Sequence, residues 1–143
     1  MNWLFDTCVL SEGIRPMPSQ KVMKWLWEIP EESIFISVLT LGELYKGIQK
    51  ITDEHRAKKM TFWLEAEIIV RLGNRILPVD DDIAIAWGAL CAQTERKGVS
   101  RPVADSLLAA TAQVHHLTVA TRNVDDFLFT GISVFNPWEE EHL

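Results

Sequence analysis

NWLFDTCVLSEG, residues 2–13, places an acid directly after a short apolar run. The run Trp3–Phe5 predicts a buried strand that ends at Asp6. Burying an ionised carboxylate is costly unless a cation or several hydrogen-bond donors meet it. Asp6 therefore needs a partner, and two interpretations are open: it is a functional ligand, or it caps the following turn.

Beyond this stretch, short apolar runs alternate with segments of helical periodicity. Further strands are predicted at residues 34–36, 76–79, 117–120 and 132–135. Helices are predicted at residues 19–28, 37–50, 53–72, 80–97 and 102–116, with a helical turn at 124–129. Strands separated by helices pair in parallel and carry helices on both faces. The predicted fold class is α/β, a three-layer α/β/α sandwich with a central parallel sheet of about five strands.

The same periodicity predicts which helical side chains face the core. Spacings of three and four place Tyr45 and Val103 on the apolar stripes of their helices, and the helix predicted at residues 53–72 is rich in apolar residues that include Phe62. Trp25 and Trp27, two residues apart, cannot both face inward from one helix. The exposed member of this pair is expected either to form part of a groove for a partner helix or to cover its own core from outside.

Length and composition fit a single domain, residues 1–143. The chain is 48% hydrophobic and 24% charged, which favours a folded globule over disorder. No apolar run approaches the ~20 residues of a membrane span, and no signal peptide is evident, so a cytoplasmic location is expected. Cys8 and Cys91 lack metal-site spacing and are expected to be reduced thiols.

The formal charge of −6 weighs against broad nucleic-acid binding but permits a nuclease whose centre is rich in carboxylates. The basic residues are scattered, and the densest group is Arg56, Lys58 and Lys59. We interpret that group as a solvated helix face.

Polar residues that follow the predicted strands define a candidate site. In open parallel sheets the ligand crevice lies beyond the carboxyl ends of the strands. Oxygen-bearing side chains reach this edge from four segments far apart in the chain, and they are Asp6, Glu43, Asp105, Asn123, Asp125 and Asp126.

Most of these residues also have a purely structural interpretation. Thr40 and Glu43 match a capping box, in which the glutamate satisfies a backbone amide. Asp105 near a helix start is favourable through the helix dipole alone. Asp125 or Asp126 can cap a turn. The joint pattern outweighs these separate explanations.

Clustered carboxylates without histidine or cysteine favour the hard cations Mg²⁺ or Mn²⁺ over zinc. A metal held by Asp6 and Asp105 could polarise a scissile phosphate, lower the pKa of a bound water and orient it for in-line attack. Glu43 would bind a second ion or position that water. Attack by water leaves a 5′-phosphate and a 3′-hydroxyl.

Four segments resemble the PIN domain, and closely its VapC and FitB toxin branch, in the same order over nearly the whole chain. They are LFDTCVLSE, ISVLTLGELYKGI, PVADSLLAATA and VATRNVDDFLFTGISVFNPW. Each is weak alone, but the four together, ending in FNPW, are specific. The resemblance implies a Mg²⁺- or Mn²⁺-dependent endoribonuclease that acts as the toxin of a type II toxin-antitoxin pair.

The resemblance also assigns positions. The family's first three acids fall on Asp6, Glu43 and Asp105, and its hydroxyl positions fall on Thr7 and Thr121.

The fourth acid is where this sequence departs from the family pattern. Alignment of TRN puts Asn123 where many relatives carry an aspartate, and Asp126 could substitute from the next turn. The fourth ligand and the number of metal ions stay open.

The implied partners are an RNA substrate, a second copy in a homodimer, and a VapB-like antitoxin with a helix in an apolar groove. No membrane partner is expected. Arg15, Lys46, Arg101 and Arg122 lie in or near the same loops and are candidate contacts to RNA phosphates. The alternative for each is an exposed solubilising charge.

Two rival classes remain at this stage. A phosphatase of the haloacid dehalogenase type also has an acid after its first strand, but it typically needs a second Asp where this chain has Cys8. A non-catalytic interaction module would use the acids only as helix caps. Such a module should show no stabilisation by Mg²⁺ or Mn²⁺.

Overall fold

A computed structural model describes residues 1–139 of the chain, and residues 140–143 lie outside the described part. Its sheet has the order β3-β2-β1-β4-β5, and every neighbouring pair is parallel. The strands are β1 (Trp3–Phe5), β2 (Ile34–Ser37), β3 (Ile76–Leu77), β4 (Thr118–Ala120) and β5 (Val134–Phe135). The predicted five-strand parallel sheet is confirmed, although three of the strands are shorter than expected.

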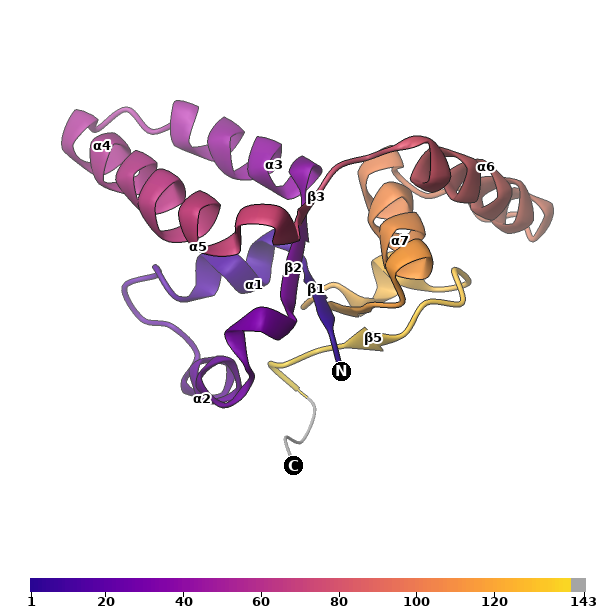
Figure 1. Ribbon diagram of the computed structural model, residues 1–143, viewed down its shortest axis with the longest axis horizontal. Coiled ribbons are helices and arrows are strands. Elements are labelled where there is room, and N and C mark those ends of the chain that lie inside the picture. The colour runs from indigo at the N-terminus through magenta and orange to yellow at the C-terminus, as the bar shows by residue number, and fades with distance from the viewer. Residues whose placement is uncertain (140–143) are drawn as a thin grey trace.

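Helices cover both faces of this sheet (Figure 1). One side carries α1 (Thr7–Glu12), α2 (Gln20–Glu28), α3 (Val38–Gln49), α4 (Glu54–Phe62) and α5 (Val70–Leu72). The other side carries α6 (Asp81–Arg96) and α7 (Val103–His115). Short 3₁₀ segments are η1 (Glu31–Ser33), η3 (Gly73–Arg75) and η4 (Val124–Phe127). Within residues 1–139, no helix is long and apolar enough to cross a bilayer.

The alternation of side chains along β1 builds two cores, one on each face of the sheet. Leu4 packs into the core beneath α6 and α7, and Trp3 and Phe5 pack into the opposite core. Trp25 of α2 completes the second core, with its ring nearly perpendicular to that of Trp3 and 5.0 Å away between centroids. Trp27 is the exposed member of its pair, at 91%.

Two core assignments from periodicity are wrong, because Tyr45 and Val103 are 52% and 61% exposed, and the apolar Phe62 is also exposed, at 67%. Val103 lies in the first turn of α7, and the buried face of that helix begins further along. Phe62 ends α4 just before a π-helical segment, η2 (Trp63–Ile69). A π turn holds more residues than an α turn, so the apolar stripe changes phase there.

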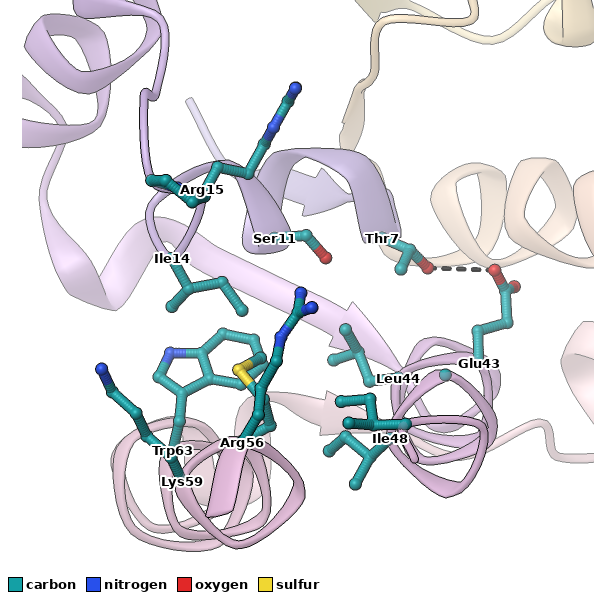
Figure 2. A pocket seen from close by; sticks show the side chains of 14 residues that line it. Thr7, Ser11, Ile14, Arg15, Glu43, Leu44, Ile48, Arg56, Lys59 and Trp63 are labelled. Atoms are coloured by element: carbon teal, nitrogen blue, oxygen red, sulfur yellow. Dashed lines mark hydrogen bonds between the residues drawn. The ribbon is translucent and has the colours of Figure 1, made fainter. Parts of the chain in front are cut away.

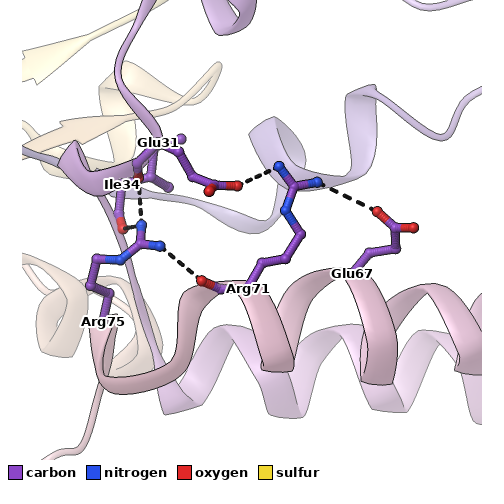
Figure 3. Close-up of polar contacts among 5 residues, drawn as sticks. All are labelled: Glu31, Ile34, Glu67, Arg71 and Arg75. Carbon is purple, nitrogen blue, oxygen red and sulfur yellow. Dashed lines mark hydrogen bonds and ion pairs between the residues drawn. The ribbon is translucent and has the colours of Figure 1, made fainter.

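The segment after this π helix is fastened to the start of β2 by two arginines (Figure 3). Arg75 donates to the carbonyl oxygens of Ile34 at 2.9 Å and Arg71 at 2.8 Å, and also to that of Glu31. Arg71 pairs with Glu31 and, at 3.5 Å, with Glu67. These contacts satisfy backbone acceptors beside the edge of the sheet.

The strand order positions the site. Successive strands run outward from β1 through β2 to β3, and the chain then returns to place β4 on the other side of β1. The order therefore reverses between β1 and β4, and ligands of open α/β sheets bind at such a reversal. Asp6 and Thr121 directly follow these two strands.

Candidate active site

Asp6 is met by hydrogen-bond donors on both of its carboxylate oxygens. Its Oδ1 accepts from the backbone N–H of Thr7 at 2.8 Å, which caps α1. Its Oδ2 accepts from the hydroxyl of Thr121, also at 2.8 Å. The cap interpretation is therefore correct locally, but it accounts for only one oxygen. The second bond crosses the β1–β4 reversal and links residues that are 115 positions apart in the chain.

Thr121 is fully buried and holds together the loop after β4. Its hydroxyl oxygen accepts from the backbone N–H of Asn123 at 3.0 Å and lies 3.8 Å from the Cys8 sulfur. Burial is the main cause that raises the pKa of the Cys8 thiol, with a smaller contribution from the charge of Asp6. A protonated, half-buried thiol is a poor nucleophile. Cys8 and Cys91 are free thiols, as expected.

Glu43 points into the site because α3 starts earlier than a capping box would require. Ser37 caps the helix, accepting from the N–H of Leu39 at 3.0 Å. The capping-box interpretation is therefore wrong: Thr40 is fully buried within the helix, and its hydroxyl has no hydrogen-bond partner among residues 1–139. Glu43 instead accepts from the hydroxyl of Thr7 at 3.0 Å.

Asp105, in the first turn of α7, is the point where the acidic residues converge electrostatically. Partial burial is the main cause that raises the pKa of its carboxyl group. The negative charges of Asp126, Asp6 and Glu43 raise it further, in that order, and Arg101 opposes them. Three carboxylates from three other segments therefore act on Asp105 at the carboxyl edge of the sheet.

The remaining candidates lie beside this group. Asn123 and Asp125 are exposed and, with Asp126, line a polar cavity of about 390 Å³. Among residues 1–139, no three His, Cys, Asp or Glu side chains have the spacing of a closed metal site. The acids therefore lie along one edge of the sheet, but no three of them are close enough together to coordinate one ion.

Three of the four predicted phosphate contacts have partners within the protein. Arg15 forms an ion pair with the buried Glu12 at 3.1 Å. Arg101 donates to a backbone carbonyl at 3.2 Å. The guanidinium of Arg122 lies 5.3 Å from the centre of the Trp138 indole ring. Lys46 is exposed near the end of α3.

A groove of about 950 Å³ opens directly from Thr7 and Glu43 (Figure 2). It runs between α1, α3 and α4, and apolar side chains make up most of its wall, among them Ile14, Leu44, Ile48, Ile51, Met60 and Trp63. The exposed Trp27 is not among the residues that line it. This groove is therefore separate from the exposed tryptophan of α2, and whether Trp27 contacts a partner stays a prediction.

Sequence reasoning missed two cations on this groove. Arg56 and Lys59 line it, together with Trp63, whereas Lys58 does not. Of the three basic residues on this helix, Arg56 and Lys59 therefore lie on the groove and Lys58 lies outside it. The spacing of three and four residues from Arg56 to Lys59 to Trp63 is the signal that could have placed these three residues on one face.

Comparison with known proteins agrees with this arrangement. Residues 3–129 match the model of the PIN domain family. The toxin FitB of Neisseria gonorrhoeae is 34% identical over 96% of this chain and 99% of its own length. A VapC ribonuclease of Sinorhizobium fredii is 33% identical over 95% and 97%.

The crystal structure of FitAcB from Neisseria gonorrhoeae contains a chain that superposes with a TM-score of 0.93 at 34% identity, covering 96% of this chain and 99% of that one. Sequence family, full-length relatives and fold therefore agree. The chain belongs to the PIN domain family, in its VapC/FitB-like toxin branch.

Proposed function

We propose that this protein is a Mg²⁺- or Mn²⁺-dependent endoribonuclease and the toxin of a type II toxin-antitoxin pair. The observation that carries the proposal is the environment of Asp105, whose carboxyl group is surrounded by the charges of Asp126, Asp6 and Glu43. Like charges gathered from distant segments are unfavourable for stability alone. The VapC relative is a ribonuclease by name, which supports RNA as the substrate.

The donor chemistry of the site fits a hard divalent cation. Asp6, Glu43, Asp105 and Asp126 offer only oxygen atoms, the ligands that Mg²⁺ and Mn²⁺ prefer. A bound ion would stabilise charge on the scissile phosphate and activate a water for attack. Because no closed group exists among residues 1–139, we propose that the carboxylates draw together when the ion enters.

The chain's own residues prepare this site. Each carboxylate oxygen of Asp6 accepts one hydrogen bond, so lone pairs remain on both for an ion. The Thr121 hydroxyl fixes the direction of Asp6, and the Thr7 hydroxyl holds Glu43 beside it. Water attack at phosphorus would then leave a 5′-phosphate and a 3′-hydroxyl.

Asp126 is the better candidate for the fourth acid. Its charge is the foremost electrostatic contribution to the raised pKa of Asp105, whereas Asn123 is exposed and uncharged. Asp125 provides a matched control, because it is the adjacent aspartate and is exposed. We expect Asp126→Asn to lower kcat much more than Asp125→Asn. Equal effects would return the assignment to Asn123.

We also propose an antitoxin as the protein partner and a homodimer as the assembly. The resemblance to the VapC and FitB branch implies an inhibiting antitoxin, and the apolar wall of the groove fits a partner segment with apolar anchors. Co-expression with a candidate antitoxin, followed by purification of the complex and an RNA cleavage assay, tests this. A toxin that binds no antitoxin, or remains active in the complex, would contradict it.

The direct test of the activity is incubation of the purified protein with a total RNA pool. Cleavage should require Mg²⁺ or Mn²⁺, leave 5′-phosphate ends, and disappear in Asp6→Asn. Cleavage that Asp6→Asn retains would refute the site. A protein that neither cleaves RNA nor is stabilised by either ion would be the non-catalytic module.

A further inference from the structure

We propose that Arg56 and Lys59 hold the phosphates of a single-stranded RNA segment in the groove between α1, α3 and α4, and so guide it to the carboxylate site. This inference rests on the proposed ribonuclease function and specifies how the substrate is bound. It assigns a role to two side chains for which the four-acid site has no use.

The groove reaches the proposed acid site at Glu43. Thr7 and Glu43, which are joined by a hydrogen bond of 3.0 Å, lie at one end of the groove wall. Arg56 projects from α4 on the opposite wall and reaches toward Ser11, and Lys59 extends from the same helix on the side of Trp63 that faces away from Glu43 (Figure 2). An RNA strand lying along this groove would therefore present a phosphate to Glu43 and its neighbours.

The negative charge of the chain and of the acid site means that RNA binding in the groove requires cations. The chain carries a formal charge of −6, and the negative charges of Asp126, Asp6 and Glu43 act on Asp105 at the proposed cleavage site. This field repels a polyanion unless Lys and Arg residues compensate for it beside the site.

Arg56 and Lys59 are available for that purpose. Within residues 1–139, neither has an ion-pair partner, because the salt bridges of this part of the chain involve Arg15 and Arg71. Arg15, which also lines the groove, is already paired with Glu12. Arg56 and Lys59 therefore carry the uncompensated positive charge of the groove.

The spacing of these cations suits a single strand. Arg56 and Lys59 are three residues apart on α4, which separates them by about 4.5 Å along the helix axis. Trp63 follows one turn later and is half-buried, with part of its indole on the groove. Cations along a groove with an aromatic ring beside them are the usual platform for single-stranded nucleic acid, because unpaired bases can stack.

An antitoxin segment is the other candidate for the same groove. Its binding would depend on the apolar wall formed by Leu44, Ile48 and Met60. Phosphate binding depends on the two cations and weakens steeply with salt. Substitutions that remove only the charges therefore separate the two occupants.

The test compares Arg56→Gln/Lys59→Gln with Lys58→Gln, a matched control on the same helix that does not line the groove. KM and kcat for a single-stranded RNA are measured from low to moderate salt. The double variant should raise KM several-fold and leave kcat nearly unchanged. Its slope of log(kcat/KM) against log salt should become shallower by about 0.7 for each lost phosphate contact. Lys58→Gln should match the wild type.

Three results would overturn the inference. The first is that KM and the salt slope of the double variant match those of Lys58→Gln while the wild type cleaves RNA. The ribonuclease function would then be supported, but Arg56 and Lys59 would not bind the RNA. If the double variant weakens only inhibition by the antitoxin, the cations serve the protein partner. If kcat falls as much as kcat/KM, the residues act at the cleavage step instead of in binding.

Thermal melting of each variant serves as the folding control. Arg56, Lys58 and Lys59 are all exposed, so none of the substitutions should lower Tm. Should the double variant fail to fold, the single change Lys59→Gln against Lys58→Gln repeats the comparison. Failure of the proposed function itself would look different, because the wild type would then not cleave RNA with either ion.

Discussion

Glu12 and Asp105 are two acids in opposite environments. Glu12 is only 3% exposed, and it accepts hydrogen bonds from the N–H of Ser19 at 2.8 Å and from Arg15 at 3.1 Å. The bond from Ser19 is the main cause that lowers the pKa of its carboxyl group, and Arg15 adds to it. Asp105 is less buried, yet burial and three neighbouring carboxylates raise its pKa.

The difference distinguishes an acid that stabilises the fold from one that we propose serves catalysis. Glu12 is surrounded by donors, so its charge is stabilised by the fold and joins α1 to the start of α2. Asp105 lies near three charges of its own sign, which raise the pKa of its carboxyl group, and Arg101 opposes them. Burial alone therefore does not distinguish the two. The sign of the neighbouring charges does.

The largest expected effect is on catalysis. Asp105→Asn should lower kcat for RNA by at least about 100-fold, more than the 10–100-fold typical for residues that only orient a metal ligand. Glu12→Gln should leave kcat near the wild-type value, since it preserves shape and lies outside the acid group. Steady-state cleavage of one RNA by both variants measures the contrast. Equal losses would remove the distinction between the two acids.

The second largest expected effect is on the free energy of unfolding, and it concerns Glu12. Glu12→Ala removes the acceptor of a buried N–H and the partner of Arg15, so it should lower the free energy of unfolding by about 1–3 kcal/mol. Asp105→Asn should not destabilise the protein, because it relieves repulsion from Asp126, Asp6 and Glu43. Urea denaturation compares the two. A destabilised Asp105→Asn would show that its charge serves the fold.

The smallest effect is the pH dependence, which should have opposite signs for the two residues. The folded pKa of Asp105 lies above the ordinary 3.8, so its ionisation reduces stability as pH rises through the folded pKa. The folded pKa of Glu12 lies below the ordinary 4.5, so it contributes stability above 4.5 that is lost as pH falls through the folded pKa.

Melting of the wild type, Asp105→Asn and Glu12→Gln from acid to neutral pH measures this effect. At neutral pH, Asp105→Asn should melt above the wild type and Glu12→Gln below it. Both differences should vanish at pH values well below the two folded pKa values. Differences of the same sign would contradict the assigned environments.

Much of the fold could be predicted from local patterns. Apolar runs separated by amphipathic helices predicted the parallel sheet, and the acid after Trp3–Phe5 marked the correct edge of it. The phase change at the π segment could not be predicted, because periodicity assumes a regular helix. The single regular helix expected over residues 53–72 is therefore divided into α4, the π segment and α5.

The sequence placed Asp6, Glu43 and Asp105 at one edge of the sheet, but it predicted neither the hydroxyl contacts of this region nor its groove. The bond from Thr121 to Asp6 joins residues far apart in the chain, and the PIN resemblance supplied the position of Thr121 without that partner. The capping-box pattern of Thr40 and Glu43 is a short motif that a competing cap at Ser37 displaced. The groove depends on packing between three helices, and no local pattern reports that packing.

Titration of the wild type with Mn²⁺, followed by thermal melting, tests the central claim most directly. An ion that binds among the crowded carboxylates stabilises the folded state, by about 2.7 kcal/mol at one hundred times its Kd. We predict a rise in Tm that is lost in Asp105→Asn and retained in Glu12→Gln. A wild-type Tm that does not respond to Mn²⁺ or Mg²⁺, or an equal rise in Asp105→Asn, would contradict the account.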